Sequence, residues 1–234
     1  MSPDPWQEEL LRSRYDRVLL NCSRQSGKSQ VAAALAIAHA LFHPARYGQP
    51  ALVLLLSPTL RQSGELFRDK VKRLYNDLGR PIAIKSVSAL TMELVNGSRI
   101  ISLPGEGETI RGYSGVTLAV IDEAAQVPDS LYFAVRPMLA ISKGVLVVLS
   151  TPWGKRGWFY DEWIEPKKRW KRIEVSAQQC PRISREFLKE ERLSLGERWF
   201  RQEYCCSFED TMDAVFSSDD INAAVRSDVK PLWG

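Results

Sequence analysis

Short apolar runs, each about the length of one strand, recur along the chain between turn residues and longer segments with helical spacing. They predict strands at residues 18–21, 51–56, 118–122, 145–149 and 172–176. Runs that are apolar at nearly every position are typical of parallel strands covered on both faces. Residues 91–95 and 99–103 flank Asn96-Gly97, which predicts a β-hairpin because this pair readily adopts positive φ in a two-residue turn.

Segments in which apolar residues recur every three or four positions predict helices between the strands. We expect these helices over residues 6–14, 28–42, 65–78, 130–140, 184–193 and 197–206. Proline cannot donate the backbone hydrogen bond of a helix, so the second should stop before Pro44 and the fourth should be interrupted near Pro137. The alternation of strands and helices predicts an α/β fold with a mostly parallel central sheet flanked by helices.

One strand-to-helix turn carries a candidate chemical site. Residues 22–29 read CSRQSGKS and follow the first apolar run. In a phosphate-binding P-loop, backbone N–H groups and the helix N-terminus bind the phosphate oxygens. Lys28 would reach the terminal phosphates, and the Ser29 hydroxyl would bind Mg²⁺. The usual pattern begins with glycine where this chain has Cys22, so a polar turn that only caps a helix is the alternative.

A second candidate site lies about a hundred residues later, where the apolar run 118–121 ends in Asp122-Glu123. Ligands of open α/β sheets bind at the carboxyl ends of the strands. Asp122 would hold magnesium, directly or through water, and Glu123 would orient or deprotonate the attacking water. The alternative is an exposed acidic pair at a strand end. Two such sites in this order favour a P-loop nucleotide hydrolase.

The third strand end, Ser150-Thr151-Pro152, carries small hydroxyl side chains that can sense a γ-phosphate through a bridging water. The same residues also make good turn chemistry, so this signal alone leaves both interpretations open.

Bulk composition is ordinary for a globular protein of one domain with a small appendage. The chain has 234 residues, 44% hydrophobic and 26% charged, and a net charge of +4. The polar N-terminal residues 1–12 do not resemble a signal peptide, and no apolar run approaches a membrane span. Four cysteines without a CxxC pair indicate reduced thiols. We therefore expect a protein that is neither secreted nor bound to a membrane.

The motifs together resemble the ATPase domain of the large terminase subunit, the motor that packages double-stranded DNA into tailed-phage heads. The motifs that carry this resemblance are Trp6-Gln7, Arg24 within the P-loop, Arg111-Gly112, Asp122-Glu123-Ala124-Ala125, Thr151-Pro152-Trp153-Gly154, and Phe200-Arg201-Gln202-Glu203-Tyr204 followed by Val215-Phe216-Ser217. They span nearly the whole chain. The resemblance implies a P-loop NTPase fold of the RecA-like, ASCE type. It also implies an ATPase core over residues 1–177 and a small helical lid or linker subdomain over 178–234.

The resemblance also implies residue roles. The ATP-binding residues would be Gln7, Ser23, Arg24, Gln25, Ser26, Gly27, Lys28 and Ser29. Gln7 would read the adenine, Arg24 would contact the γ-phosphate in cis, and Arg111 would be an arginine finger offered to a neighbouring subunit. Which of the two arginines acts as the finger stays open. Ser150, Thr151 and Pro152 would couple hydrolysis to motion, and Arg73 and Arg99 are candidates for DNA contact.

The implied ligands are ATP and Mg²⁺, and the implied partners are double-stranded DNA, further copies in a ring on a portal, and the small terminase subunit. The expected location is the host cytoplasm, transiently at the procapsid portal. Full-length relatives add a nuclease domain, which we do not expect in these 234 residues. Two alternatives remain: another P-loop DNA translocase or superfamily 2-like helicase domain, and a non-hydrolysing nucleotide-binding scaffold. A helicase needs a second RecA-like domain, and Glu123 argues against the scaffold.

Overall fold

A computed structural model describes residues 3–13, 15–105, 110, 112–166, 169–210, 220 and 223–224. Within these residues a single sheet of eight strands has the order β3-β4-β5-β2-β6-β7-β1-β8. The strands are β1 Arg17–Cys22, β2 Leu52–Ser57, β3 Ile84–Val87, β4 Thr91–Leu94, β5 Arg99–Pro104, β6 Leu118–Asp122, β7 Val145–Ser150 and β8 Lys171–Val175.

The six strands from β5 to β8 in that order pair in parallel, and β4 pairs antiparallel with both β5 and β3. The predicted α/β architecture and the hairpin at Asn96-Gly97 are therefore confirmed. Strand β3 was not predicted, because this short strand at the edge of the sheet is mostly exposed and lacks apolar alternation.

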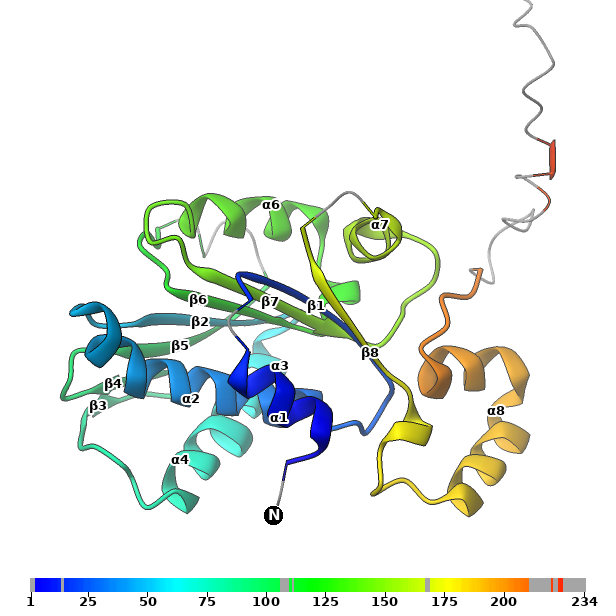
Figure 1. The fold of residues 1–234 in the computed structure, drawn as a ribbon, viewed down its shortest axis with the longest axis horizontal. Coiled ribbons are helices and arrows are strands. Elements are labelled where there is room, and N and C mark those ends of the chain that lie inside the picture. The colour runs from blue at the N-terminus through cyan, green and yellow to red at the C-terminus, as the bar shows by residue number, and fades with distance from the viewer. Residues whose placement is uncertain are drawn as a thin grey trace, which may run out of the picture.

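Helices cover both faces of the sheet (Figure 1). One face carries α1 Pro5–Arg12, α2 Lys28–Tyr47 and a continuous helical segment made of α3 Leu60–Glu65, the π-helix Leu66–Lys72 and α4 Arg73–Asp77. The other face carries α6 Asp129–Met138 and α7 Gly157–Ile164. Short 3₁₀ turns span Ala124–Gln126 and Ala177–Gln179, and α8 Arg185–Cys205 lies beyond the β8 edge. None of the helices in the described ranges is long and apolar enough to cross a membrane.

Successive residues of the central strands alternate between two apolar layers. In β1, Val18 and Leu20 pack in the layer under α2, whereas Leu19 packs in the layer under α6 and α7. All three side chains are fully buried or nearly so. Because both faces are covered, neither needs polar residues, which explains why the strands read as continuous apolar runs.

Two proline predictions were wrong. The helix α2 continues through Pro44 to Tyr47, and α6 includes Pro137 without a break. Both prolines lie in the last turn of their helix and lack the N–H that would bond the carbonyl four residues earlier. For Pro44 that carbonyl belongs to Ala40, and it accepts a hydrogen bond of 2.9 Å from the Asn96 side-chain amide instead. The stop signal for α2 is Gly48, whose φ of 69° is left-handed and whose N–H donates to the Pro44 carbonyl.

The segment predicted as one helix over 65–78 begins earlier, after Thr59, whose hydroxyl accepts a hydrogen bond from the Gln62 N–H. Its wider π segment starts at Leu66. One turn earlier, the Ser63 carbonyl accepts a hydrogen bond of 2.9 Å from the Ser102 hydroxyl on β5. The helix α8 is broken at Gly196, with φ 76° and ψ 162°, as the sequence predicted.

Candidate nucleotide-binding site

The strand order places the three predicted motifs side by side at the carboxyl ends of neighbouring strands. Strand β7 lies between β1, which leads into the P-loop, and β6, which leads into Asp122. Asn21 of β1 pairs with Ser150 of β7, and Asp122 pairs with Leu149. Since these strands are parallel, their carboxyl ends meet where open α/β sheets bind ligands.

The loop from Ser23 to Gly27 has the backbone of a tight anion-binding turn. Gly27 precedes the first residue of α2 and has φ 91°, which glycine adopts without steric cost. Gln25 is also left-handed, with φ 60°. The Ser23 N–H donates to the Val175 carbonyl at 2.8 Å, which ties the loop to β8.

Replacing Gly27 by alanine tests this geometry. A Cβ at Gly27 would lie 2.7 Å from the Gln7 amide nitrogen, and its φ is unfavourable for alanine. We expect Gly27→Ala to weaken ATP binding at least tenfold and to lower the melting temperature. Gly64→Ala is the matched control, since Gly64 lies in α3 with nothing within 4 Å of an added Cβ. Titration calorimetry and thermal denaturation measure both effects, and equal behaviour of the two variants would contradict the assignment.

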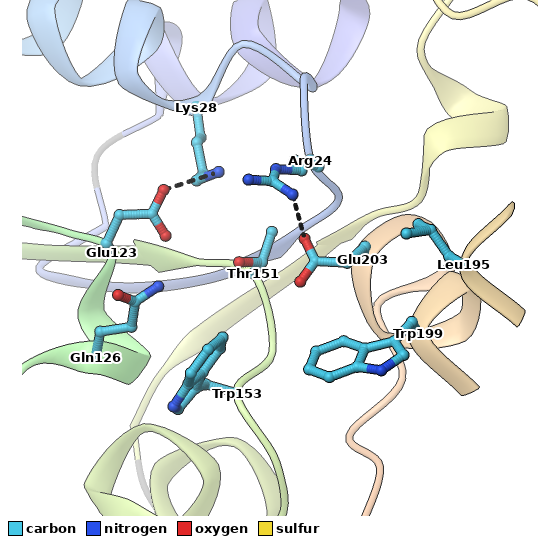
Figure 2. A pocket seen from close by; sticks show the side chains of 9 residues that line it. All are labelled: Arg24, Lys28, Glu123, Gln126, Thr151, Trp153, Leu195, Trp199 and Glu203. Atoms are coloured by element: carbon cyan, nitrogen blue, oxygen red, sulfur yellow. Dashed lines mark ion pairs between the residues drawn. The ribbon is translucent and has the colours of Figure 1, made fainter. Parts of the chain in front are cut away.

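Two side-chain contacts join the P-loop to the acidic end of β6. The Ser29 hydroxyl donates to Asp122 Oδ2 at 2.8 Å, and Lys28 Nζ lies 3.1 Å from Glu123 Oε1. Glu123 has φ 52° and ψ 42°, a left-handed turn that directs its side chain away from the strand and toward Lys28 (Figure 2). Residues 93 positions apart thus form one cluster.

The cluster has shifted titration behaviour because it is buried. Burial and the neighbouring Glu123 carboxylate raise the pKa of Asp122 to about 6. Burial lowers the pKa of Lys28, but the Glu123 and Asp122 carboxylates outweigh burial and leave that pKa raised. Lys28 therefore stays charged at neutral pH.

The donor set fits a magnesium ion. The Ser29 hydroxyl and the Asp122 carboxylate are adjacent oxygen ligands, and Asp122 is almost completely buried. Mg²⁺ prefers oxygen, and in phosphate sites it takes only one or two protein ligands beside phosphate and water. A cation there would also relieve the electrostatic cost of the buried Asp122 carboxylate.

A cavity of about 370 Å³ opens beside this cluster (Figure 2). Its lining residues are Arg24, Lys28, Glu123, Gln126, Thr151, Trp153, Leu195, Trp199 and Glu203. The core contributes one wall and α8 the other. Arg24 connects them: its N–H donates to the Glu203 carbonyl at 2.8 Å, and its guanidinium lies 3.7 Å from the Glu203 carboxylate.

Sequence reasoning missed the α8 wall of this cavity. Leu195, Trp199 and Glu203 lie on both sides of the Gly196 break, so their side chains meet the P-loop only in the folded chain. The one signal available was the 200–204 motif, which includes Glu203.

The three coupling candidates occupy different environments at the end of β7. The buried Ser150 hydroxyl accepts a hydrogen bond of 3.1 Å from the Ala125 N–H, two residues after Glu123. Thr151 lines the cavity, and Pro152 is buried beside it. Ser150 thus links the acidic turn to the neighbouring strand. The coupling role of these three residues stays a prediction.

The structure places the remaining predicted residues as follows. Gln7 is buried, and its amide donates to the Gly27 carbonyl at 3.4 Å. Arg111 lies outside the described residues. Arg73 is exposed on α4, 4.0 Å from Asp77. Arg99 is the first residue of β5, which runs parallel to β2. It therefore lies at the amino ends of the parallel strands, whereas the P-loop lies at their carboxyl ends. The DNA contacts of Arg73 and Arg99 stay predictions.

A sequence model of the family described as terminase large subunit, T4likevirus-type, N-terminal, matches residues 19–223. The chain belongs to this family. The terminase large subunits of Thermus phage G20c and Thermus virus P23-45 are each 26% identical to it over an alignment 254 positions long, which covers 94% of this chain. The alignment covers 51% of each relative, so the chain spans about half the length of the curated relatives it matches.

Solved structures of terminases share the fold. The large terminase ATPase domain of Thermus phage P74-26 has a TM-score of 0.71 at 23% identity, covering 88% of this chain and 94% of that one. The large terminase of a second thermophilic bacteriophage, in complex with ADP, has a TM-score of 0.70 at 15% identity, covering 88% of this chain and 54% of that one. The terminase resemblance and the fold class predicted from the sequence are confirmed.

Proposed function

We propose that this terminase domain hydrolyses Mg-ATP and couples hydrolysis to translocation of double-stranded DNA into a procapsid. The observation that carries the proposal is the pair of contacts Ser29–Asp122 and Lys28–Glu123. They bring a phosphate-binding loop, two oxygen ligands for magnesium and a candidate base into one cluster. The second thermophilic-phage terminase, which shares the fold, has been solved with ADP and with ATP-γ-S.

Each residue has a role in this proposal. Backbone N–H groups of the P-loop bind the phosphates, and Lys28 moves from Glu123 to the terminal phosphates. Glu123, once released from Lys28, orients the attacking water and accepts its proton. Arg24, whose side chain is 65% exposed at the cavity, contacts the γ-phosphate. Magnesium, when held by Ser29 and Asp122, neutralises charge that develops on the phosphates.

Coupling to motion would pass through the contacts between the P-loop strand and α8. Arg24 contacts Glu203 through both backbone and side chain, and the Asn21 amide donates to the Cys206 carbonyl at 2.8 Å. A change at the γ-phosphate alters the position of Arg24 and hence the position of α8. Ser150, Thr151 and Pro152 would transmit the same change through β7.

The domain division and the partners belong to the same proposal. A separate small apolar cluster of Ala177, Leu188, Phe200 and Tyr204 supports a lid subdomain that begins near residue 178. The proposed partners are double-stranded DNA, further copies of the chain in a ring on the portal, and the small terminase subunit, in the host cytoplasm.

A phosphate-release assay with and without double-stranded DNA tests the function. We expect slow release by the purified chain, strict dependence on Mg²⁺, and faster release when the full-length motor assembles with portal and DNA. Release that is absent under every condition would indicate a nucleotide-binding scaffold. Release coupled to strand separation would indicate a helicase.

Arg111 can be tested by mixing subunits. An Arg111→Ala subunit retains its own Glu123, whereas a Glu123→Ala subunit can still offer Arg111 to its neighbour. We expect the mixed ring to recover part of the ATPase activity that each variant lacks alone, measured as phosphate release. An absence of recovery would assign the finger role to Arg24.

A further inference from the structure

Two consecutive carbonyl groups of the P-loop accept hydrogen bonds from side chains outside the loop. The Ser26 carbonyl accepts a hydrogen bond of 3.1 Å from Arg182 Nη2. The Gly27 carbonyl accepts hydrogen bonds of 3.1 Å from the Gln30 and Val31 N–H groups of α2, and a longer one of 3.4 Å from Gln7 Nε2. Neither Arg182 nor Gln7 is part of the P-loop itself, residues 22–29.

These bonds determine where the loop N–H groups point. The Ser26 carbonyl and the Gly27 N–H belong to one planar trans peptide, so they point in opposite directions. The Gly27 carbonyl and the Lys28 N–H are related in the same way. A carbonyl fixed on the outside of the loop therefore fixes the following N–H toward the phosphate side, where donors are required.

Such fixing matters most at Gly27, since glycine has access to more backbone conformations than any other residue. Its φ of 91° is one of several values available to it. The peptide after Gly27 is fixed by α2, but a rotation of the Ser26–Gly27 peptide, whose carbonyl Arg182 binds, would turn an oxygen toward the phosphates. An oxygen there would repel the triphosphate.

Arg182 is itself held rigidly. Its two terminal nitrogens donate to Asp4 Oδ1 and Oδ2, each at 2.7 Å. The Asp4 side chain is only 8% exposed and that of Arg182 is 38% exposed, so solvent screens this pair less than a surface pair. The Asp4 N–H in turn donates to Gln7 Oε1 at 3.0 Å. We call Asp4, Gln7 and Arg182 the outer bracket.

We propose that Arg182 is a positioning residue for nucleotide binding. Through the outer bracket it orients the Gly27 N–H, and its place between the 3₁₀ turn Ala177–Gln179 and α8 ties this orientation to the segment leading into the lid. The inference rests on the proposed function. Gln7 keeps one amide hydrogen and one lone pair unused by these contacts, so the adenine-reading role remains available to it.

The test compares ATP with inorganic tripolyphosphate, which has the phosphates but no base. We expect Arg182→Ala to weaken the binding of both ligands by about tenfold or more in titration calorimetry, because a charge-assisted hydrogen bond that orients a donor is lost. The value of kcat at saturating Mg-ATP should stay within about threefold of wild type while KM rises, since Arg182 does not touch the reacting atoms.

Two further variants and a control sharpen the test. Asp4→Asn keeps the shape but weakens the ion pair, so it should shift both affinities in the same direction by a smaller factor. Arg182→Lys can pair with Asp4 but cannot also reach Ser26 with the same geometry, and should recover only part of the loss. Arg192→Ala is the matched control on α8, because Arg192 forms an exposed pair with Glu197 and should leave both affinities unchanged.

Three results would overturn the inference. One is unchanged affinity for tripolyphosphate together with lost selectivity for ATP over GTP, which would make Arg182 a base contact. Another is a lower melting temperature with both affinities intact, which would leave only a structural role. The third is a KM unaffected by Asp4→Asn if Arg182→Ala fails to fold. Failure of wild type to bind ATP would instead refute the proposed function.

Discussion

Glu123→Gln is expected to bind ATP normally and to hydrolyse it at least about a hundredfold more slowly, because removal of a general base typically costs two to four orders of magnitude in rate. The amide keeps the shape of Glu123 but cannot accept the proton of the attacking water. It also removes the charge that holds Lys28 at 3.1 Å, so Lys28 is freer to meet the phosphates and ATP affinity should not fall. Phosphate release and titration calorimetry measure the two effects separately.

The control for Glu123→Gln is Gln126→Ala, which changes another residue of the same cavity wall. It should retain turnover within about threefold, since Gln126 is assigned no proton transfer. If Glu123→Gln also stays within that range, Glu123 is not the base and the assignment of the acidic turn fails.

Lys28→Ala is expected to weaken ATP binding severely and also to lower the stability of the fold. Lys28 supplies the positive charge facing Glu123 and Asp122, and its removal loses charge-assisted bonds to the terminal phosphates. It also leaves two carboxylates in a buried cluster without their cation. We expect ATP binding at least about a hundredfold weaker by calorimetry. Lys171→Ala, at an exposed pair with Glu9, is the control.

The stability effect of Lys28→Ala has a defined pH dependence. The folded-state pKa of Asp122, already raised to about 6, should rise further once Lys28 is gone. A carboxyl whose folded pKa exceeds its unfolded value contributes stability that is present at low pH and lost as pH rises through the folded pKa. The free energy of unfolding of Lys28→Ala should therefore fall further below wild type at pH 7.5 than at pH 5. Equal deficits at the two pH values, or unchanged ATP affinity, would contradict the role of Lys28.

Most of the sheet could be predicted because its strands are short runs that are apolar on both faces. The site could be predicted because its chemistry lies at strand ends, and parallel strands bring those ends to one edge. Ser29 and Asp122 illustrate this, since their contact follows from β1 and β6 lying on either side of β7.

What the sequence did not predict depends on contacts between distant segments. The ion pair of Asp4 and Arg182 joins residues 178 positions apart, and nothing near either residue indicates the other. The α8 wall of the cavity likewise depends on how α8 meets the P-loop. The passage of α2 through Pro44 was missed for the same reason: the Asn96 side-chain amide donates to the Ala40 carbonyl that Pro44 leaves without its helical donor, and Gly48 ends the helix.

The central claim is that Ser29 and Asp122 share one magnesium ion with a bound triphosphate, and a double-variant measurement of Mg²⁺-dependent ATP affinity tests it most directly. ATP affinity is measured with and without Mg²⁺ for wild type, Ser29→Ala, Asp122→Asn and the double variant. We expect each single variant to lose most of the gain in affinity that Mg²⁺ gives wild type, and the double variant to lose little more. Losses that simply add, or a full Mg²⁺ gain in the double variant, would show that the two residues do not hold a common ion.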